Sequence, residues 1–433
     1  MFENLLRVST SSRVLVLCAV VLAQKFLATE LSSPFIVLLG LLVMFFGKIQ
    51  RGYLKLVWPL LGVLVIGLMG MGVFGLGYES RHILRDIAFA LTPIALIFIG
   101  WWIAGNRGMW PLILKVMVIL GFVLALTHLS FFVLNPALLS AKAMDVRSVA
   151  GMSGDLVSLA LVIGLFFQKR FGINDLFPRL LPRLIVMPVL LASFVLSYSR
   201  TEFVVVLILS LALLGVLTKV NSRMILAIAV LVIGFFALAL TTPKDEVGTF
   251  RSKLVRSVTE IAVSDYHNMS DINFHWRGFE SYRVWATFLS GNLSQQIFGQ
   301  GFGALVDLGF VMPLGGNKFR YIPVFHNGYA YILIKTGLIG LACYVFFYIS
   351  VIRYSVRYCQ TTNGEQEILA RLLLGCVLSL IAIMYVVGGM AETRSSELVL
   401  LLGYLVRRMR QFQTEKSRIE VVRSKLGYHS VHF

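Results

Sequence analysis

Long apolar runs, repeated along most of the chain and separated by short polar turns, limit most strongly how this sequence can fold. Many of them approach the roughly 20 residues that an α-helix needs to cross a hydrocarbon core about 30 Å thick. With 58% hydrophobic and 14% charged residues, the chain has too little polar surface to cover a soluble globule of 433 residues. Because backbone polar groups in lipid must be satisfied within each segment, the runs predict helices. The sequence therefore predicts an all-α, polytopic membrane bundle.

Twelve segments have the length and composition of membrane-spanning helices. They are residues 13–29, 32–47, 56–77, 86–104, 109–134, 149–167, 184–198, 201–218, 224–241, 327–352, 367–390 and 395–408. Lysine and arginine collect in alternate turns, and the positive-inside rule assigns those turns to the cytoplasm. This distribution explains much of the net charge of +18. It predicts that both termini are cytoplasmic.

The spacing of the apolar runs divides the chain into four regions. They are residues 1–241 with nine spans, a long periplasmic loop at 242–325, three further spans in 326–408 and a basic cytoplasmic tail at 409–433. Helical periodicity at 251–263 and 279–289 predicts short helices in the loop, packed against the mouth of the bundle. The tail alternates basic and apolar residues, which predicts an amphipathic helix on the anionic inner leaflet.

His326 stands where the long polar loop meets the next apolar run, so we expect it at the boundary between water and bilayer. A histidine in such a position often has only an interfacial, hydrogen-bonded role. Asn327 follows it directly, and the small residues Gly337 and Gly340 allow this helix to pack closely on a neighbour. Close packing alone also explains the two glycines, and both roles are compatible.

Three arginines are candidates for binding an anion. Arg200 interrupts two apolar runs, which is costly in lipid unless the side chain faces a cavity or a partner. It either forms a tight turn with Glu202 as ion-pair partner or binds a phosphate through two parallel hydrogen bonds. Arg277 and Arg283 lie in the long loop, where one can bind substrate while the other pairs with an acid such as Glu280 or is solvated.

The acidic residues do not predict a metal site. Those of the loop, which lack the paired spacing of metal ligands, are Asp265, Asp271, Glu280 and Asp307. The glycine-rich turn at 299–303 lacks the lysine and flanking elements of a nucleotide-binding loop. We therefore expect no metal and no cofactor. Glu392 lies at the outer end of the last hairpin, where it can orient an acceptor sugar or His326, or only cap a helix.

The pattern His326-Asn327, nine residues, Gly337 and Gly340 resembles the signature of the O-antigen ligase family. More loosely, it resembles the related O-antigen polymerases and bacterial protein O-oligosaccharyltransferases. Residues 197–201 (Ser-Tyr-Ser-Arg-Thr) look like the family's Ser-x-Ser-Arg element. Arg277, followed by Phe-Gly-Gln-Gly at 298–301, looks like the arginine and Phe-Gly-x-Gly turn of its large loop. The order and spacing of these motifs together carry the resemblance.

The resemblance implies an inverting, metal-independent glycosyltransferase of lipopolysaccharide biosynthesis in the bacterial inner membrane. Such an enzyme moves a glycan from undecaprenyl pyrophosphate to a sugar of the lipid A core, on the periplasmic face, with membrane lipids around it and no nucleic acid. The implied site has His326 as the base that takes the acceptor proton. The implied pyrophosphate ligands are Arg200, Arg277 and Arg283, and the supporting residues are Asn327, Glu280, Glu392, Gly337 and Gly340.

Three alternatives stay open at this stage. An O-antigen polymerase uses the same donor but a second lipid-linked glycan as acceptor, and a protein O-oligosaccharyltransferase glycosylates protein. A transporter of lipid-linked glycans would only bind anionic head groups, and it would place charges near the bilayer midplane in paired half-helices. The candidate residues gather instead at the outer ends of the predicted spans, which favours an enzyme. The match at His326-Asn327 favours the ligase.

Overall fold

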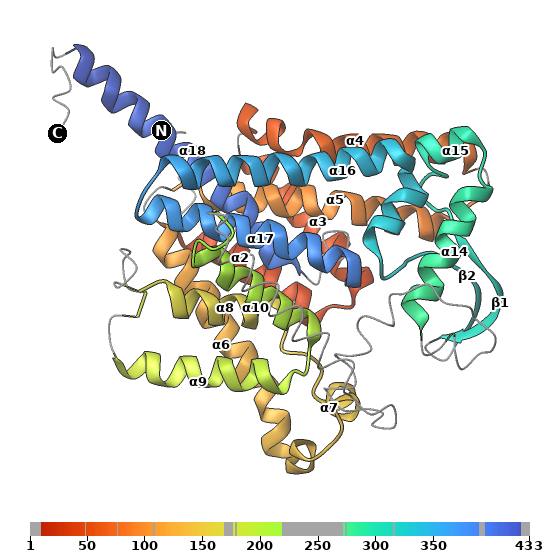
Figure 1. Ribbon diagram of the computed structural model, residues 1–433, viewed down its shortest axis with the longest axis horizontal. Helices are drawn as coiled ribbons and strands as arrows, with labels where there is room; N and C mark the ends of the chain where they lie inside the picture. Colours follow the sequence, from red (N-terminus) through yellow and green to blue (C-terminus); the bar gives the residue numbers. More distant parts are fainter. Residues whose placement is uncertain are drawn as a thin grey trace.

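The computed structural model describes residues 10–47, 49–75, 77–106, 109–168, 176–177, 180–218, 272, 275–314, 317–388 and 395–425. This part of the chain is predominantly helical, and most of the helices run along the long axis of the molecule (Figure 1). Five described helices are long and apolar enough to cross a membrane. They are α4 (Arg51–Phe74), α5 (Ser80–Ile103), α6 (Trp110–Leu134), α16 (Gly328–Thr361) and α17 (Glu365–Val387).

Shorter helices and one long C-terminal helix complete the bundle. They are α2 (Thr10–Phe26), α3 (Thr29–Phe46), η2 (Pro136–Leu139), α7 (Ala143–Val149), α8 (Asp155–Phe166), α9 (Leu180–Leu196), α10 (Arg200–Leu213) and α18 (Ser396–Lys425). A described helix therefore lies in every predicted span except 224–241, which falls outside the described residues. The total of twelve spans stays a prediction.

Some predicted boundaries were wrong. The expected span 149–167 holds only the shorter helix α8, because α7 ends at Val149 and the positive φ angles of Gly151 (75°) and Gly154 (95°) separate the two helices. Helix α5 begins at Ser80, six residues earlier than expected, and so takes Asp86 into the bundle. Helix α18 continues to Lys425 as one helix through the position where the tail was expected to begin.

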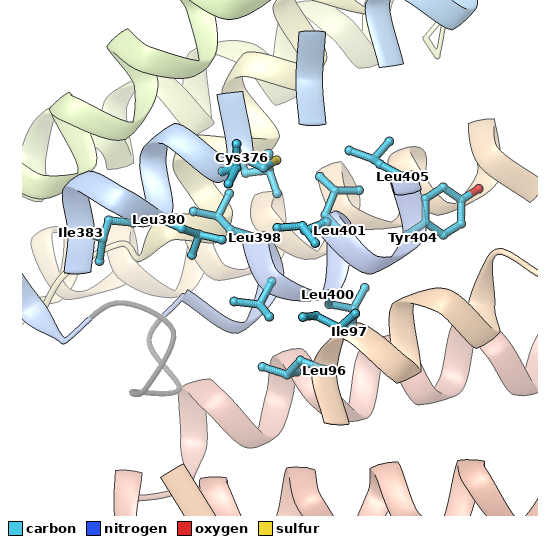
Figure 2. Packing of buried hydrophobic residues seen from close by; sticks show 14 of the residues in the cluster. Leu96, Ile97, Cys376, Leu380, Ile383, Leu398, Leu400, Leu401, Tyr404 and Leu405 are labelled. Carbon is cyan, nitrogen blue, oxygen red and sulfur yellow. The ribbon is translucent and has the colours of Figure 1, made fainter. Parts of the chain in front are cut away.

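The core extends through the bundle, and one part of it lies where α5, α17 and α18 meet (Figure 2). Leucines of α17 and α18 interlock there with Leu96 and Ile97 of α5, all with almost no exposed surface. Helices α5 and α18 approach closely because each has a glycine at the contact. A Cβ atom on Gly100 would lie 1.9 Å from Leu400 O, and one on Gly403 would lie 2.2 Å from Ile97 O. Small residues at helix contacts are a common way to pack helices in membranes.

One end of the bundle is covered by α14 (Trp276–Ser290), α15 (Leu293–Phe298) and an antiparallel hairpin of β1 (Val306–Leu314) and β2 (Asn317–Ile322). The C-terminal part of α18 projects from the opposite end (Figure 1). Helix α14 matches the helix predicted at 279–289, whereas 251–263 lies outside the described residues. The hairpin was not predicted. Its signal is the alternation of buried Val306, Leu308 and Met312 with exposed residues, which is the period of a strand.

Helix α16 is broken at Gly337, whose φ of 64° and ψ of −166° are not helical. A Cβ atom there would lie 2.3 Å from Ile297 O of α15, so glycine allows this close contact. The backbone N–H groups of Gln300 and Gly301 donate to the carbonyl groups of Ile334 and Lys335, at 2.8 and 3.0 Å. The 299–303 turn thus donates hydrogen bonds to two carbonyl groups beside the break. Backbone carbonyl groups in a membrane need such partners, because lipid supplies none.

A buried ion pair holds the same region together. Lys335 Nζ lies 2.6 Å from Asp86 Oδ2, and both side chains have no exposed surface. The Asp86 carboxylate also accepts hydrogen bonds from the Tyr331 hydroxyl and the Gly303 N–H group, each at 2.8 Å, and Lys335 also donates to Ala304 O. The network joins α5, α16 and the 299–303 turn. Removing one partner of such a pair typically costs about 3–5 kcal/mol of stability.

Candidate active site

A cavity of about 720 Å³ lies among α2, α7, α10, α14 and α17, with His326 in its wall. Its lining residues come from distant parts of the chain. They are Gln24, Lys25, Arg147, Met152, Gly154, Asp155, Ser199, Arg200, Thr201, Glu202, Val204, Arg277, His326, Ala382, Ile383, Val386 and Ser395. In Figure 1, α7, α14 and the start of α10 lie toward the end that the hairpin covers.

His326 is held by a carboxylate. Its Nδ1 atom lies 3.1 Å from Glu280 Oε2, and its backbone N–H donates to the same oxygen at 2.9 Å. Glu280 is almost fully buried, whereas 46% of the His326 side chain is exposed. An imidazole that donates from Nδ1 to a carboxylate has its Nε2 atom available as a proton acceptor. The arrangement therefore orients a base toward the cavity.

The residues on either side of His326 fix its backbone. Phe325 has 2% of its surface exposed and packs in the core. Asn327 caps α16, since its side-chain oxygen accepts hydrogen bonds from the N–H groups of Tyr329 and Ala330 at 3.1 and 3.2 Å. These contacts position the backbone of His326, and Glu280 contacts its Nδ1 atom. The sequence predicted supporting positions for both Asn327 and Glu280, and the structure brings both to the histidine.

Arg200 reaches the cavity from a strained turn. Tyr198 has a φ of 46°, the one positive value that a non-glycine residue adopts in the described part of the chain. Such a conformation typically costs about 1–2 kcal/mol. It ends α9 and allows Ser199 to cap α10, with its hydroxyl oxygen accepting from Glu202 N at 3.4 Å. Arg200, as the first residue of α10, then lines the cavity.

Glu202, the ion-pair partner that the sequence offered for Arg200, makes other contacts in the same wall. Its carboxylate accepts hydrogen bonds from Ser153 Oγ at 2.5 Å and from Gly154 N at 3.0 Å, with 2% of the residue exposed. These contacts join the start of α10 to the segment before α8. They hold the turn that carries Arg200 in place.

The two loop arginines have different environments. Arg277 lies in the first turn of α14 and lines the cavity. Arg283 is not among the lining residues, and its Nε and Nη2 atoms donate to Asp307 O of β1 at 2.9 and 2.7 Å. The sequence did not decide which of Arg277 and Arg283 binds the anion, and it suggested Glu280 as the ion-pair partner of the remaining arginine. In the structure, Glu280 contacts His326 and Arg277 lines the cavity.

Two further cations were missed by the reasoning from sequence. Lys25 at the end of α2 and Arg147 in α7 line the cavity. Lys25 Nζ donates to the carbonyl oxygen of Met152 at 3.0 Å, and Arg147 Nη2 donates to the Sδ atom of Met152 at 2.8 Å. Their signal was a cation near the outer end of a predicted span, since Lys25 lies within 13–29 and Arg147 lies just before 149–167. Asp155 was also missed, and its carboxylate accepts from Ser395 Oγ at 2.8 Å. Glu392 lies outside the described residues.

The cavity combines an anion-binding part with an apolar wall. Lys25, Arg147, Arg200 and Arg277 bring four positive side chains, and the first turns of α8, α10 and α14, where helices favour negative charge, also contribute lining residues. On α17 the lining residues are Ala382, Ile383 and Val386. Guanidinium groups suit phosphate oxygens because they donate two parallel hydrogen bonds. The arrangement can hold a phosphorylated, partly apolar ligand next to an imidazole.

Comparison with known families adds a second line of evidence. Residues 184–345 match the family described as O-antigen ligase. This part of the chain is therefore similar to the O-antigen ligase family. The matched region begins within α9 and ends within α16, so it includes Arg200, Arg277, Glu280 and His326. O-antigen ligase family proteins are membrane enzymes of the glycosyltransferase type, with lipid-linked glycans as substrates. No curated protein sequence matches the chain.

Proposed function

We propose that this protein is an O-antigen ligase of the bacterial inner membrane. It would transfer a polysaccharide from undecaprenyl pyrophosphate to a hydroxyl group of the lipid A core, with inversion and without a metal ion. The observation that carries the proposal is that Arg200, Arg277 and His326, which are distant in sequence, line one cavity. The match to the O-antigen ligase family over residues 184–345 supports the same class of reaction.

The donor fits the two parts of the cavity. Lys25 and Arg147 supplement Arg200 and Arg277, so the pyrophosphate group would meet four cations from four segments. The apolar wall on α17 suits the beginning of the polyprenyl chain. Positive groups fixed around the pyrophosphate stabilise the charge that develops on it as the glycosidic bond breaks, and their effect is large in a site with little water.

His326 is the proposed general base. The acceptor hydroxyl oxygen forms a bond to the anomeric carbon, while the bond from that carbon to the pyrophosphate oxygen breaks and its electron pair leaves with undecaprenyl pyrophosphate. The hydroxyl proton passes to Nε2 of His326, because Nδ1 faces Glu280. A single displacement of this kind inverts the configuration at the anomeric carbon. The proton is then released to water, to which the half-exposed imidazole has access.

The distribution of charge supports a periplasmic site. Helix α4 begins with Arg51 and Lys55, and the middle of α18 holds Arg407, Arg408 and Arg410. Both segments lie at the end of the bundle opposite to α14 and the hairpin (Figure 1). Because lysine and arginine favour the cytoplasmic side, the cavity would open on the other side. The lipid A core acceptor would be available there.

The acceptor separates the ligase from its alternatives. Purified protein in liposomes would be given a pyrophosphate-linked glycan together with lipid A core, a second lipid-linked glycan or a protein acceptor. A ligase modifies the lipid A core. Elongation of the lipid-linked glycan would identify a polymerase, modification of the protein would identify an O-oligosaccharyltransferase, and no transfer with any acceptor would contradict the proposed enzyme.

Variants of the cavity test the mechanism. His326→Ala should bind the donor and transfer nothing, whereas Arg277→Ala should bind it weakly. Arg320→Ala is a matched control, since this arginine is exposed on β2 and pairs with Asp307 away from the cavity. Full transfer by His326→Ala would exclude it as the base. Loss of transfer in a chelator, with recovery on adding a divalent ion, would contradict the metal-independent reaction.

A further inference from the structure

The outer surface of α14 and α15 is unusually apolar. On α14, Tyr282, Trp285 and Leu289 are 45%, 53% and 62% exposed. Their spacing of three and four residues places them on one face of the helix. On α15, Leu293 and Phe298 are 71% and 44% exposed. We call these five side chains the outer apolar face. A helix that meets water on its outer side normally carries polar residues there, so this face needs another explanation.

The opposite side of α14 already packs against the protein. Phe279, Val284 and Phe288 are at most 7% exposed and belong to the core, and Glu280 on the same side reaches His326. The outer apolar face therefore does not belong to this buried side. Helix α14 is apolar on two sides, one toward the bundle and one toward the surroundings.

The position of the neighbouring 299–303 turn along the membrane-spanning helices indicates what the outer apolar face contacts. The 299–303 turn, which follows Phe298 directly, contacts α4 at Gly67 and Gly70, with Phe302 N–H donating to Gly67 O at 3.2 Å. At 1.5 Å per residue, these glycines lie about 6–10 Å before the end of α4 at Phe74. On α16 the turn binds the carbonyl groups of Ile334 and Lys335, about 9–10 Å after the helix begins. The turn lies well inside the ends of both apolar helices.

The outer apolar face is also continuous with a surface that should face lipid. Met69 and Val73 of α4 are 61% and 66% exposed, and Leu338 of α16, next to the break at Gly337, is 51% exposed. Helix α15 packs against both α4 and α16. In Figure 1, α15 lies beside the ends of these two helices, and α14 continues from it across the end of the bundle. The lipid-facing surface of the spans thus extends onto α15 and α14.

We propose that α14 and α15 lie in the membrane interface, with the outer apolar face inserted into the boundary between head groups and acyl chains. The partner is the lipid leaflet on the side of the cavity. Tyr282 and Trp285 suit this position, because amphipathic aromatic rings concentrate where hydrocarbon meets water. An apolar helix face buried about 5–10 Å at this boundary is typical of interfacial helices.

The arrangement connects the lipid surface to the cavity through one helix. Arg277 and Glu280 lie in the first two turns of α14, and Trp285 and Leu289 lie further along it. Contact of the outer apolar face with lipid therefore sets the depth of the cavity-lining arginine relative to the membrane. The inference concerns a surface that the transfer reaction does not use, so it holds whether or not the proposed function is right.

Cysteine accessibility tests the proposal in liposomes that contain only the purified protein and phospholipid. Leu289→Cys and Leu293→Cys probe the outer apolar face, and Ser290→Cys and Ser294→Cys are matched controls at neighbouring exposed positions. A charged, membrane-impermeant maleimide should react with the first pair on the order of tenfold more slowly than with the second, because lipid shields those thiols. After denaturation in detergent all four should react alike. The native Cys359 and Cys376 are buried, whereas Cys18 and Cys343 are partly exposed, so the reaction of the protein without an added cysteine is subtracted as background.

Equal rates at the four positions in liposomes would overturn the proposal. Protection in whole cells without protection in liposomes would also overturn it, because it would assign the face to a protein partner. A second measurement needs no cysteine. The fluorescence of Trp285 is the difference between the wild-type protein and Trp285→Phe. Brominated lipid should quench this fluorescence. Quenching by iodide in water instead would contradict insertion.

Discussion

The contact between Glu280 and His326 gives the sharpest prediction of the proposed mechanism. Glu280 Oε2 accepts hydrogen bonds from the backbone N–H and from Nδ1 of His326 at 2.9 and 3.1 Å. Glu280→Ala removes both. A hydrogen bond to a charged group contributes about 1.5–3 kcal/mol. If the bond to Nδ1 orients the base in the transition state, kcat should fall about 10- to 150-fold, at about 1.4 kcal/mol for each factor of ten.

Glu280→Gln keeps an oxygen acceptor but loses the negative charge. Neutral hydrogen bonds are roughly half as strong as charge-assisted ones, so kcat should fall only about 3- to 10-fold. The assay follows transfer from the lipid-linked donor to lipid A core in liposomes, with kcat and KM measured separately. KM for the donor should change little, since Glu280 is not among the residues that line the cavity. Ser281→Ala, on the same turn of α14, is the matched control.

The result that would refute this reasoning is a wild-type kcat in Glu280→Ala. An equal rise of donor KM in both Glu280 variants, with kcat unchanged, would also refute it, because the carboxylate would then contribute to donor binding. Retained donor binding at a wild-type level shows that the variant has folded. A loss of kcat in a protein that still binds the donor therefore reports on the position of the base.

The remaining predictions concern one cation, one glycine and one ion pair. Arg200→Ala should lower kcat/KM for the donor about 10- to 150-fold through loss of a charge-assisted bond, and Arg200→Lys should recover part of it, as measured by donor titration. Gly337→Ala should destabilise the protein by about 3 kcal/mol or more, because it strains a backbone conformation that favours glycine and displaces the 299–303 turn. The measurement is a lower Tm in detergent. Gly72→Ala, where a Cβ atom would meet nothing within 4 Å, should leave Tm unchanged or raise it. Hydrogen bonds from Arg320 hold the pKa of Asp307 below its ordinary value. The pair therefore stabilises the hairpin fully at pH values above the ordinary pKa of a carboxyl group. This stabilisation is lost as the pH falls through the lowered pKa of Asp307. Amide exchange in β1 and β2 should quicken in that acidic range, and Asp307→Asn should remove the pH dependence.

The positions of most helices could be predicted from the sequence because membrane spans have a fixed minimum length and need apolar residues throughout. Their ends were harder to predict. Asp86 looked like a residue of an outer turn, but it lies inside α5 and pairs with Lys335. A lysine within an apolar run requires a buried partner, so Lys335 itself was a signal of this pair. The partner's identity depends on contacts between α5 and α16 that no local pattern reveals.

The candidate site was predicted in outline and completed by the structure. Resemblance to a family selected Arg200, Arg277, Arg283 and His326, and all of these except Arg283 line the cavity. Lys25 and Arg147 were not selected, because each stands alone at the end of a helix and only the fold brings them to the other cations. Arg283 could not be separated from Arg277 by sequence. The difference between them lies in the hairpin, whose Asp307 carbonyl oxygen binds Arg283 and which the sequence reading did not predict.

The break in α16 has a consequence for how the protein is assembled. A membrane helix ordinarily completes its own hydrogen bonds as it enters the bilayer, but here the carbonyl groups of Ile334 and Lys335 receive donors from a turn that is synthesised earlier and rests on α4. Insertion of this span and docking of the turn must therefore be completed together. In chimaeras between related proteins, residues 299–337 should be exchanged as one block with the facing part of α4, because a junction within them would separate the donors from their acceptors.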